Sequence, residues 1–417
     1  MMSLTKYELK KIVCSPIVIT ALAVVLFINL YFVLFGSQQG YKAIQSPFDT
    51  NIPQLQEDGS LFAGEINDEW YQKHMDEQQK IINDPANQVS DEEKEEIRKD
   101  LLLRGYTEQQ IEEMGGFIYL KPEVISSNDY DKYEDIEVAA EFYNNAQQCG
   151  KMFAYEYRNL YSGEKGEILA EKAEQMYGEL AEDYKAYYNY DWGYWKLRNI
   201  HSSYPFTIGL LVLIGLSPMF SAEYSRKTDA IILSSKNGKS KLIFAKLKAG
   251  LIFAVVVWAL IEIINILTVA GMYGVTGAEA YWQNFFMDYA PFRFNQLQIT
   301  LVTIATSLLG IVFLACIILF VSVCCKNQFA SLLIGGVILL CPCLDFAFTD
   351  NAAVQKIFNF MPTRLLTGVN IWQGFDLTYL FKQAIPTQYV ILTVAVLVSI
   401  VAAYLCIVIF KHKQVEN

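Results

Sequence analysis

The residues that could carry chemistry in this chain are few and widely separated. A Gly-Lys-Ser triplet at 238–240 matches the end of a phosphate-binding loop, but Leu233 stands where that motif needs its first glycine. The HExxH and GxSxG motifs are absent. The three histidines occur singly and are interpreted as surface residues: His74, His201 and His412. We therefore expect no catalytic site, no metal site and no resident cofactor in this chain.

The eight cysteines form no redox or disulfide pattern. Seven lie in or beside apolar segments, and Cys149 is alone in a long polar region. A single cysteine cannot build a disulfide framework there. Cys341-Pro-Cys343 has the wrong spacing for a CxxC site, so we interpret it as buried apolar cysteine.

Three polar residues interrupt otherwise apolar segments. Glu262 and Asn265 are three positions apart in segment 249–273, and Asn29 lies in segment 17–35. Residues three apart share one face of a helix. An acid at mid-membrane depth costs about 2.5–3.5 kcal/mol, so this face should contact protein or water and not lipid. Two interpretations stay open: the pair lines a pathway, or it bonds another helix.

The elements that would position these residues are membrane-spanning helices. Hydrophobic residues make up 53% of the 417 residues, and the mean hydropathy is +0.23. They are bunched into runs, most of which are long enough to cross about 30 Å of hydrocarbon. We predict an all-α polytopic membrane protein with six transmembrane helices, at 17–35, 205–221, 249–273, 299–324, 329–345 and 388–410.

Basic residues assign the connecting segments to the two sides of the membrane. The positive-inside bias places four segments in the cytoplasm: 1–16, 222–248, 325–328 and 411–417. Both termini are then cytoplasmic, and 1–16 is expected to form an interfacial helix. We expect segments 36–204, 274–298 and 346–387 to lie on the outer side, with a bacterial cytoplasmic membrane as the expected location. Because no cleavage pattern closes segment 17–35, we expect an uncleaved anchor.

The large outer region, 36–204, is acidic and is predicted to be mostly α-helical. It holds 34 acidic and 16 basic residues, whereas the rest of the chain has a net charge of +7 and the whole chain −11. This balance argues against a nucleic-acid partner. Capping boxes begin at Ser90 and Thr107. The aromatic stretch 187–195 has two open interpretations: a belt at the membrane interface, or a surface for an amphipathic substrate.

Two further segments hold candidate functional residues. Segment 346–387 contains apolar pieces too short to span, such as 357–361 and 378–385, so we expect re-entrant or interfacial helices there, with Pro362 and Arg364 as candidates. The basic loop 222–248 can meet an acidic rim on a cytoplasmic partner. Its alternative role is membrane anchoring by charge alone. The candidate coupling residues are Glu223, Arg226, Lys227, Lys236, Lys239, Lys241 and Lys246.

Three motifs in this six-helix frame resemble permease subunits of ATP-binding-cassette (ABC) transporters of the type-2 exporter family. They are Glu8-Leu-Lys10-Lys11 ahead of Pro16, Phe220-x-x-Glu223 followed by Ile232-Leu233-Ser-Ser and Ala245-Lys246, and Met361-Pro362-Thr363. The sequence departs from the family's pattern at Thr228, at Lys236 and at Ala245, where glycine, proline and glycine are common.

The resemblance implies that the basic loop docks into cytoplasmic ABC ATPase subunits, which bind ATP and Mg²⁺. It also implies a second permease copy or a sister permease. The chain would export an amphipathic substrate: a peptide, lipid or drug. The competing hypothesis is a membrane-anchored receptor or sensor whose outer domain binds a peptide. A gradient-driven transporter is disfavoured, because the apolar segments lack repeated charged residues.

Overall fold

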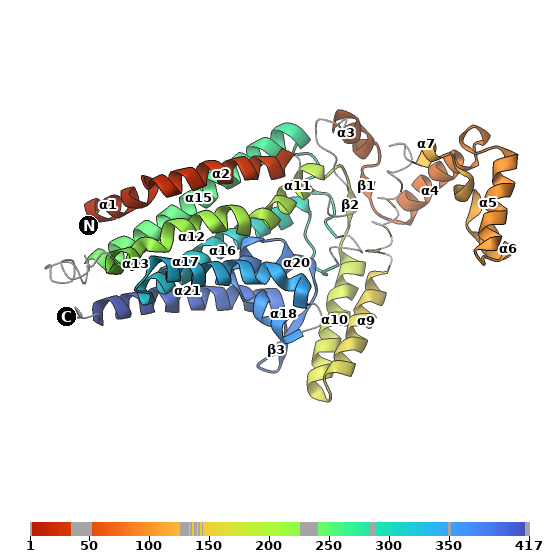
Figure 1. Cartoon of the computed structure of the whole chain (residues 1–417). Helices are drawn as coiled ribbons and strands as arrows, with labels where there is room; N and C mark the ends of the chain where they lie inside the picture. The colour runs from red at the N-terminus through yellow and green to blue at the C-terminus, as the bar shows by residue number, and fades with distance from the viewer. Residues whose placement is uncertain are drawn as a thin grey trace.

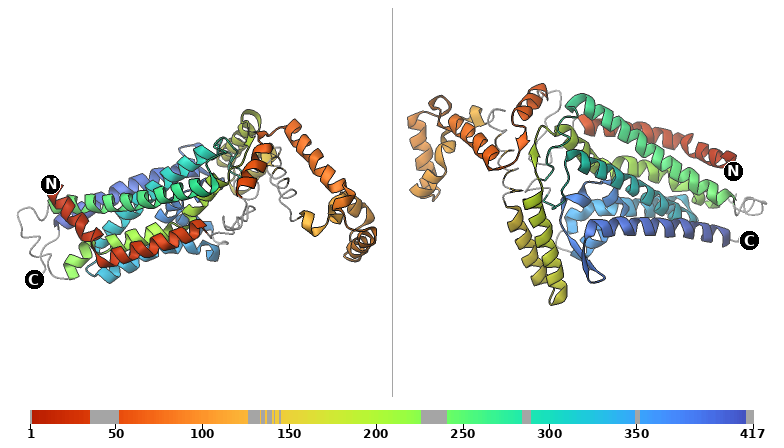
Figure 2. Two further views of the ribbon diagram at one scale, coloured as in Figure 1. Left: turned by 90° about the horizontal axis from the view of Figure 1, so that it is seen from above. Right: turned by 180° about the vertical axis from the view of Figure 1, so that it is seen from behind.

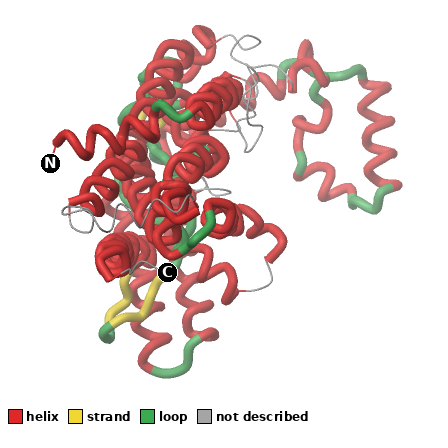
Figure 3. The backbone as a smooth tube through the Cα atoms, turned by 60° about the vertical axis from the view of Figure 1, so that its left-hand side comes forward, coloured by secondary structure: helices red, strands yellow, loops and turns green. Residues whose placement is uncertain are grey.

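The computed structural model describes residues 2–34, 52–125, 145–225, 241–283, 289–348 and 352–412, together with Tyr133, Ile136, Ala140, Phe142 and Tyr143. Helices dominate this part of the chain (Figure 3). Five of them are long and apolar enough to cross a membrane, so the chain is a multi-pass membrane protein. These helices are Pro16–Leu34, Trp192–Ser225, Lys241–Tyr273, Gln296–Cys324 and Thr387–His412.

The second of these helices begins at Trp192, well before the predicted start at 205. It is built from α11 (Trp192–Ile200), a 3-10 turn η3 (His201–Ser203), a π-helical segment η4 (Pro205–Gly209), α12 (Leu210–Leu216) and α13 (Pro218–Ser225). The break between α12 and α13 falls at Pro218. Proline has no N–H for the helical hydrogen bond, so the helix is interrupted there.

The remaining long helices pack around α16 (Gln296–Cys324). It contacts α15 (Lys241–Tyr273), α21 (Thr387–His412) and α13. The helix α2 (Pro16–Leu34) lies at the edge of the bundle, and only 22% of its most apolar 18-residue stretch is buried. A shorter apolar helix, α17 (Gln328–Leu340), continues as a 3-10 segment to Phe348. Gly335 of α17 lies so close to α12 that a Cβ atom would be 2.5 Å from Leu213 Cδ1.

The bundle has two distinct ends (Figure 1). The chain termini lie at one end, together with the end of α13 and the start of α15, which flank segment 226–240. We call this the loop end. The described part of residues 52–191, which we call the polar region, lies beyond the opposite end. We call that end the domain end, and the two further views show the same arrangement (Figure 2).

The regular elements in the described part of the polar region are helices, apart from one short strand pair. The predicted capping boxes at Ser90 and Thr107 are both present and begin α5 and α6. Strand β1 (Gly64–Glu65) pairs antiparallel with β2 (Tyr187–Tyr188). The helices are α3 (Ile52–Leu61), α4 (Asp68–Asn83), α5 (Asp91–Leu103), α6 (Glu108–Glu113), α7 (Pro122–Ile125), α9 (Ala146–Leu160) and α10 (Glu164–Asp183).

Segment 346–387 is partly helical and partly a β-hairpin. Three short helices come first: α18 (Ala352–Asn359), α19 (Pro362–Leu366) and α20 (Asn370–Gln373). The expectation of a helix over 378–385 is wrong, because β3 (Leu377–Leu380) and β4 (Gln383–Pro386) pair antiparallel there. Alternate residues Leu377 and Tyr379 pack against the core of α9 and α10, a spacing of two that suits a strand.

Tyrosine hydroxyl groups fasten the polar region to the domain end of the bundle. Tyr177 donates to the Tyr289 carbonyl at 2.9 Å, and Tyr184 donates to the Phe294 carbonyl at 2.7 Å. Tyr190 donates to the carbonyl of residue 273 at 2.9 Å. Tyr190 is also buried, at 4% exposure. This residue therefore packs inside the protein, and it contributes neither to a belt at the membrane interface nor to a surface for a substrate.

Candidate functional site

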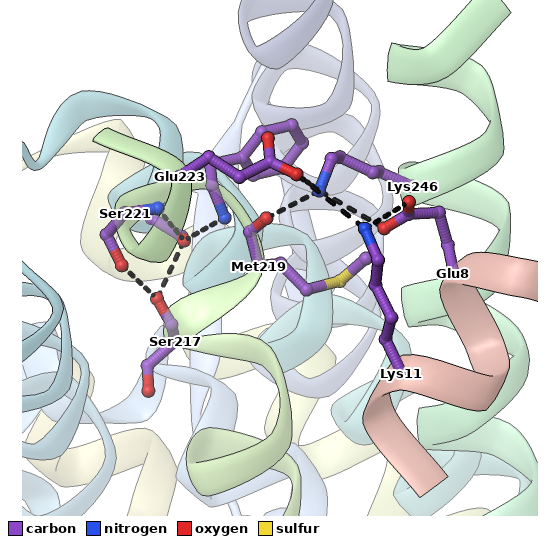
Figure 4. Close-up of polar contacts among 9 residues, drawn as sticks. Glu8, Lys11, Ser217, Met219, Ser221, Glu223 and Lys246 are labelled. Carbon is purple, nitrogen blue, oxygen red and sulfur yellow. Dashed lines mark hydrogen bonds and ion pairs between the residues drawn. The ribbon is translucent and has the colours of Figure 1, made fainter. Parts of the chain in front are cut away.

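A buried ion-pair cluster joins three helices at the loop end (Figure 4). Lys246 of α15 is 2% exposed, and its Nζ lies 2.8 Å from Glu223 Oε1 of α13. The same Nζ lies 3.2 Å from Glu8 Oε2 of α1 (Met2–Val13) and donates to the Met219 carbonyl at 2.7 Å. Lys11 Nζ lies 2.9 Å from Glu8 Oε1 and 4.0 Å from Glu223 Oε1. We call Glu8, Lys11, Glu223 and Lys246 the Lys246 joint.

Local helix geometry brings these side chains together. In α1, Glu8 and Lys11 are three residues apart, so they lie on one face, where Glu8 is buried and Lys11 reaches past it. In α13, Phe220 and Glu223 have the same spacing. The Lys246 Nζ lies 5.3 Å from the centre of the Phe220 ring, a cation–π distance.

The joint balances two carboxylates against two ammonium groups. Burial by itself raises the pKa of Glu8, but the charges of Lys246 and Lys11 outweigh it and hold that pKa below its ordinary value. Burial alone would lower the pKa of Lys11, and its contacts with Glu8 and Glu223 raise it instead. Removing one partner of a buried ion pair leaves an uncompensated charge and costs about 3–5 kcal/mol. The joint therefore holds α1, α13 and α15 in one arrangement.

Serine hydroxyl groups next to the joint fix the start of α13. The Ser217 carbonyl accepts hydrogen bonds from Ser221 Oγ at 2.7 Å, Ser322 Oγ at 2.7 Å and Ser331 Oγ at 2.9 Å. Ser322 Oγ also accepts from the Phe220 N–H at 3.1 Å. Because Ser322 belongs to α16 and Ser331 to α17, these bonds tie the break in the second helix to two neighbouring helices.

The seven predicted coupling residues are only partly brought together. Glu223 and Lys246 meet in the joint, whereas Lys241 is exposed at the start of α15. The others lie outside the described residues: Arg226, Lys227, Lys236 and Lys239. Sequence reasoning did not select Glu8 or Lys11 as site residues. The available signal was an acid three residues before a lysine in a short basic helix.

The predicted intramembrane residues meet in a second buried cluster. Asn29 Nδ2 donates to Asn265 Oδ1 at 2.6 Å, and Asn265 Nδ2 donates to the Tyr204 hydroxyl at 3.1 Å. Tyr204 donates to the Glu262 carboxylate, and Glu262 Oε2 lies 3.3 Å from His201 Nε2. We call these five residues the Glu262 cluster. In these contacts the face of Glu262 and Asn265 bonds other helices, which is the second of the two interpretations.

Two of the three histidines are not surface residues. His201 is 0% exposed and His74 is 2% exposed. His74 lies between Phe62 and Trp70, with ring centres 4.7 Å and 4.8 Å away. A single histidine in a polar segment gives no signal of burial, because the aromatic neighbours that cover it come from the fold.

Pro362 and Arg364 belong to neither cluster. Pro362 is buried at the first position of α19, where its missing N–H is not needed by the helix. The adjacent Thr363 Oγ1 donates to the Leu339 carbonyl at 2.6 Å, which joins α19 to α17. Arg364 is in the last turn of this short helix.

No family model matches the chain, and no curated protein matches it. Among the residues that the structure describes, no group of three or more His, Cys, Asp or Glu side chains could hold a metal ion.

Proposed function

We propose that this chain is the permease subunit of an ABC exporter. A separate ATPase subunit hydrolyses ATP, and the permease moves an amphipathic substrate, such as a peptide, lipid or drug, across the bacterial cytoplasmic membrane. In this proposal α17 is the fifth of six transmembrane helices, and α21 is the sixth. Both termini and segment 226–240 are cytoplasmic, the polar region is outside, and a second permease copy or sister permease completes the pair.

The observation that carries the proposal is the Lys246 joint. A loop can transmit a displacement to the helices that flank it only if those helices are held together at the two ends of the loop. Segment 226–240 leaves α13 soon after Glu223 and enters α15 shortly before Lys246, and these two residues contact at 2.8 Å. A partner that displaces the loop would therefore move α13 and α15 together. Through Glu8 it would also move α1, which leads into α2.

The first test is the identity of the partner. An affinity-tagged full-length chain is purified from its own membrane, and the proteins that accompany it are identified by mass spectrometry. We expect an ABC ATPase. Recovery of a histidine kinase with no ATPase would support the receptor hypothesis instead.

The second test separates coupling from assembly. Glu223→Lys puts a third cation beside Lys246 and Lys11, so repulsion should separate α13 from α15 at the joint. We expect the variant complex to assemble and hydrolyse ATP but to lose export of an amphipathic probe that the wild type exports. The charge-swapped variant Glu223→Lys/Lys246→Glu keeps an ion pair at this position and should recover part of the export. Unchanged export by Glu223→Lys alone would remove the role assigned to the joint.

A further inference from the structure

The Glu262 cluster contains buried proton acceptors that are not satisfied. His201 and Glu262 are 0% and 3% exposed, yet His201 Nε2 and Glu262 Oε1 have no hydrogen-bond partner among the described residues. Buried polar atoms are almost always hydrogen-bonded, and an ionisable residue within a membrane span is by default a candidate functional site. Of these two atoms, Nε2 faces the other residue, so it indicates that a hydrogen is missing between His201 and Glu262.

The orientation of His201 identifies the missing group. Its Nδ1 lies 2.8 Å from the Leu197 carbonyl, which can only accept, so Nδ1 carries a hydrogen. In the neutral ring Nε2 then carries a lone pair and no hydrogen, and this atom lies 3.3 Å from Glu262 Oε2. Two lone pairs at this distance repel each other, whereas one proton between them makes a hydrogen bond.

The rest of the cluster cannot supply that proton. The Tyr204 hydroxyl already donates to Glu262, and the Asn265 amide donates to Tyr204 at 3.1 Å. The Asn29 amide donates to Asn265 at 2.6 Å. A hard metal cation is a poor alternative occupant, because such ions take about six or more oxygen ligands and only two acceptor atoms are unsatisfied here.

Charged groups on the surrounding helices do not replace the proton. The helices α2, α12 and α16 carry no charged residue, and α15 carries none beyond Lys248 except Glu262. On α11, Arg198 donates to Gln296, which donates to Asp191. Lys196 lies on that same helix, one residue before the Leu197 that bonds His201.

We propose that His201 and Glu262 form a proton-binding site inside the helix bundle. The site takes one proton from water, holds it between Nε2 and Oε2, and is neutral when loaded. No other bond forms or breaks. Release of the proton to water leaves a buried carboxylate whose hydrogen bond from Tyr204 remains, and it removes the bond between η3 and α15. The site is independent of the proposed export function.

Proton release should also loosen α2. The hydrogen bonds from Asn29 to Asn265 and from Asn265 to Tyr204 connect α2 to the residue that bonds Glu262. Apart from this polar contact, α2 packs through a narrow apolar stripe formed by Val18, Val25 and Val33. Loading of the site with a proton is therefore expected to stabilise the docked position of α2.

The test is the pH dependence of unfolding of the full-length chain in detergent. Where the proposed folded site keeps its proton and the unfolded chain does not, the two states differ by one bound proton. Stability must then fall as the pH rises, with the unfolding constant increasing about tenfold per pH unit until the site empties. Below about pH 4.3 the unfolded pair holds two protons against one in the folded site, so stability falls again.

Two conservative variants remove the need for the proton. Glu262→Gln and His201→Gln each place a permanent amide N–H in this contact, so both should lose the alkaline slope of the wild type. Glu179→Gln is the control and should keep it, because Glu179 lies outside the cluster and pairs with Arg293 at 2.9 Å. Either amide variant alone suffices if the other does not fold. A wild-type slope in the folded amide variants, or stability that follows sodium concentration instead of pH, would overturn the proposal.

Discussion

Lys246 is the buried cation that two carboxylates share. Because it contacts both Glu8, which is buried, and Glu223, which is partly buried, its loss would leave both carboxylates without the ammonium group that they share. We expect Lys246→Ala to lower the free energy of unfolding by about 3–5 kcal/mol, measured by denaturant unfolding in detergent. Lys248→Ala is the matched control, since Lys248 is exposed two residues further along α15, and should change stability by less than about 0.5 kcal/mol. Equal changes in the free energy of unfolding for the two substitutions would contradict the stabilising role of the Lys246 joint.

The joint also predicts a sensitivity to acid. The pKa of Glu8 is lowered, because Lys246 and Lys11 outweigh the opposing effect of burial. A carboxyl group with a lowered folded pKa contributes stability above its unfolded pKa, and this contribution is lost as the pH falls through the folded value. We therefore expect the wild type to lose stability as the pH falls from about 4.5, and Glu8→Gln to lose less. Unfolding midpoints of both proteins between pH 7 and pH 3 measure the difference, and parallel curves would refute it.

At the scale of elements, α16 and α19 meet through a glycine. A Cβ atom on Gly310 would lie 2.4 Å from the Leu366 nitrogen and 2.6 Å from the Leu365 carbonyl carbon. Backbone atoms cannot move aside, so Gly310→Ala must push α19 away from α16, at a cost of about 1–3 kcal/mol. In α10, a Cβ atom on Gly178 would have no atom within 4 Å, so Gly178→Ala should stabilise by about 0.5–1 kcal/mol. The two substitutions should shift the midpoint of thermal unfolding in opposite directions. Shifts in the same direction would disprove the close contact between α16 and α19.

The elements that sequence reasoning predicted well have local causes. The caps at Ser90 and Thr107 involve residues only three apart. Long apolar runs identify membrane helices because length and hydropathy are properties of one segment. The start at Trp192 was missed, because polar and aromatic residues continue the helix beyond its apolar part.

The sites depended on contacts that no local pattern reveals. The burial of Glu262 and Asn265 against protein was predictable, since an acid within an apolar span must avoid lipid. Their partners were not, because Asn29 and Asn265 are 236 positions apart in sequence. Glu8 and Lys246 are separated by 238 positions. The charge of the basic loop predicted the region that contains the joint, whereas the tertiary fold determines which of its charged side chains are buried.

At the scale of the whole molecule, the polar region and the bundle share a hydrophobic core. Phe375 and Leu377 come from the segment between α20 and α21, yet they pack with Leu169 and Tyr177 of α10. The Phe375 ring lies 5.1 Å from Phe153 and 5.2 Å from Tyr177, both in edge contact. The helical pair α9 and α10 is therefore completed by a segment that belongs to the bundle.

This shared core predicts that a change in the bundle segment loosens the distant helical pair. Phe375→Ala removes a ring that is 7% exposed, which costs about 3–5 kcal/mol when the cavity does not collapse. We expect faster hydrogen exchange in α9 and α10 and unchanged exchange in α16, because the lost contacts all lie on the domain side. Phe381→Ala is the control, since Phe381 is 88% exposed at the turn of the β3–β4 hairpin and should leave exchange unchanged. Faster exchange in α16 as well would mean that the bundle and the polar region unfold as one cooperative unit, whereas unchanged exchange throughout would mean that Phe375 does not stabilise α9 and α10.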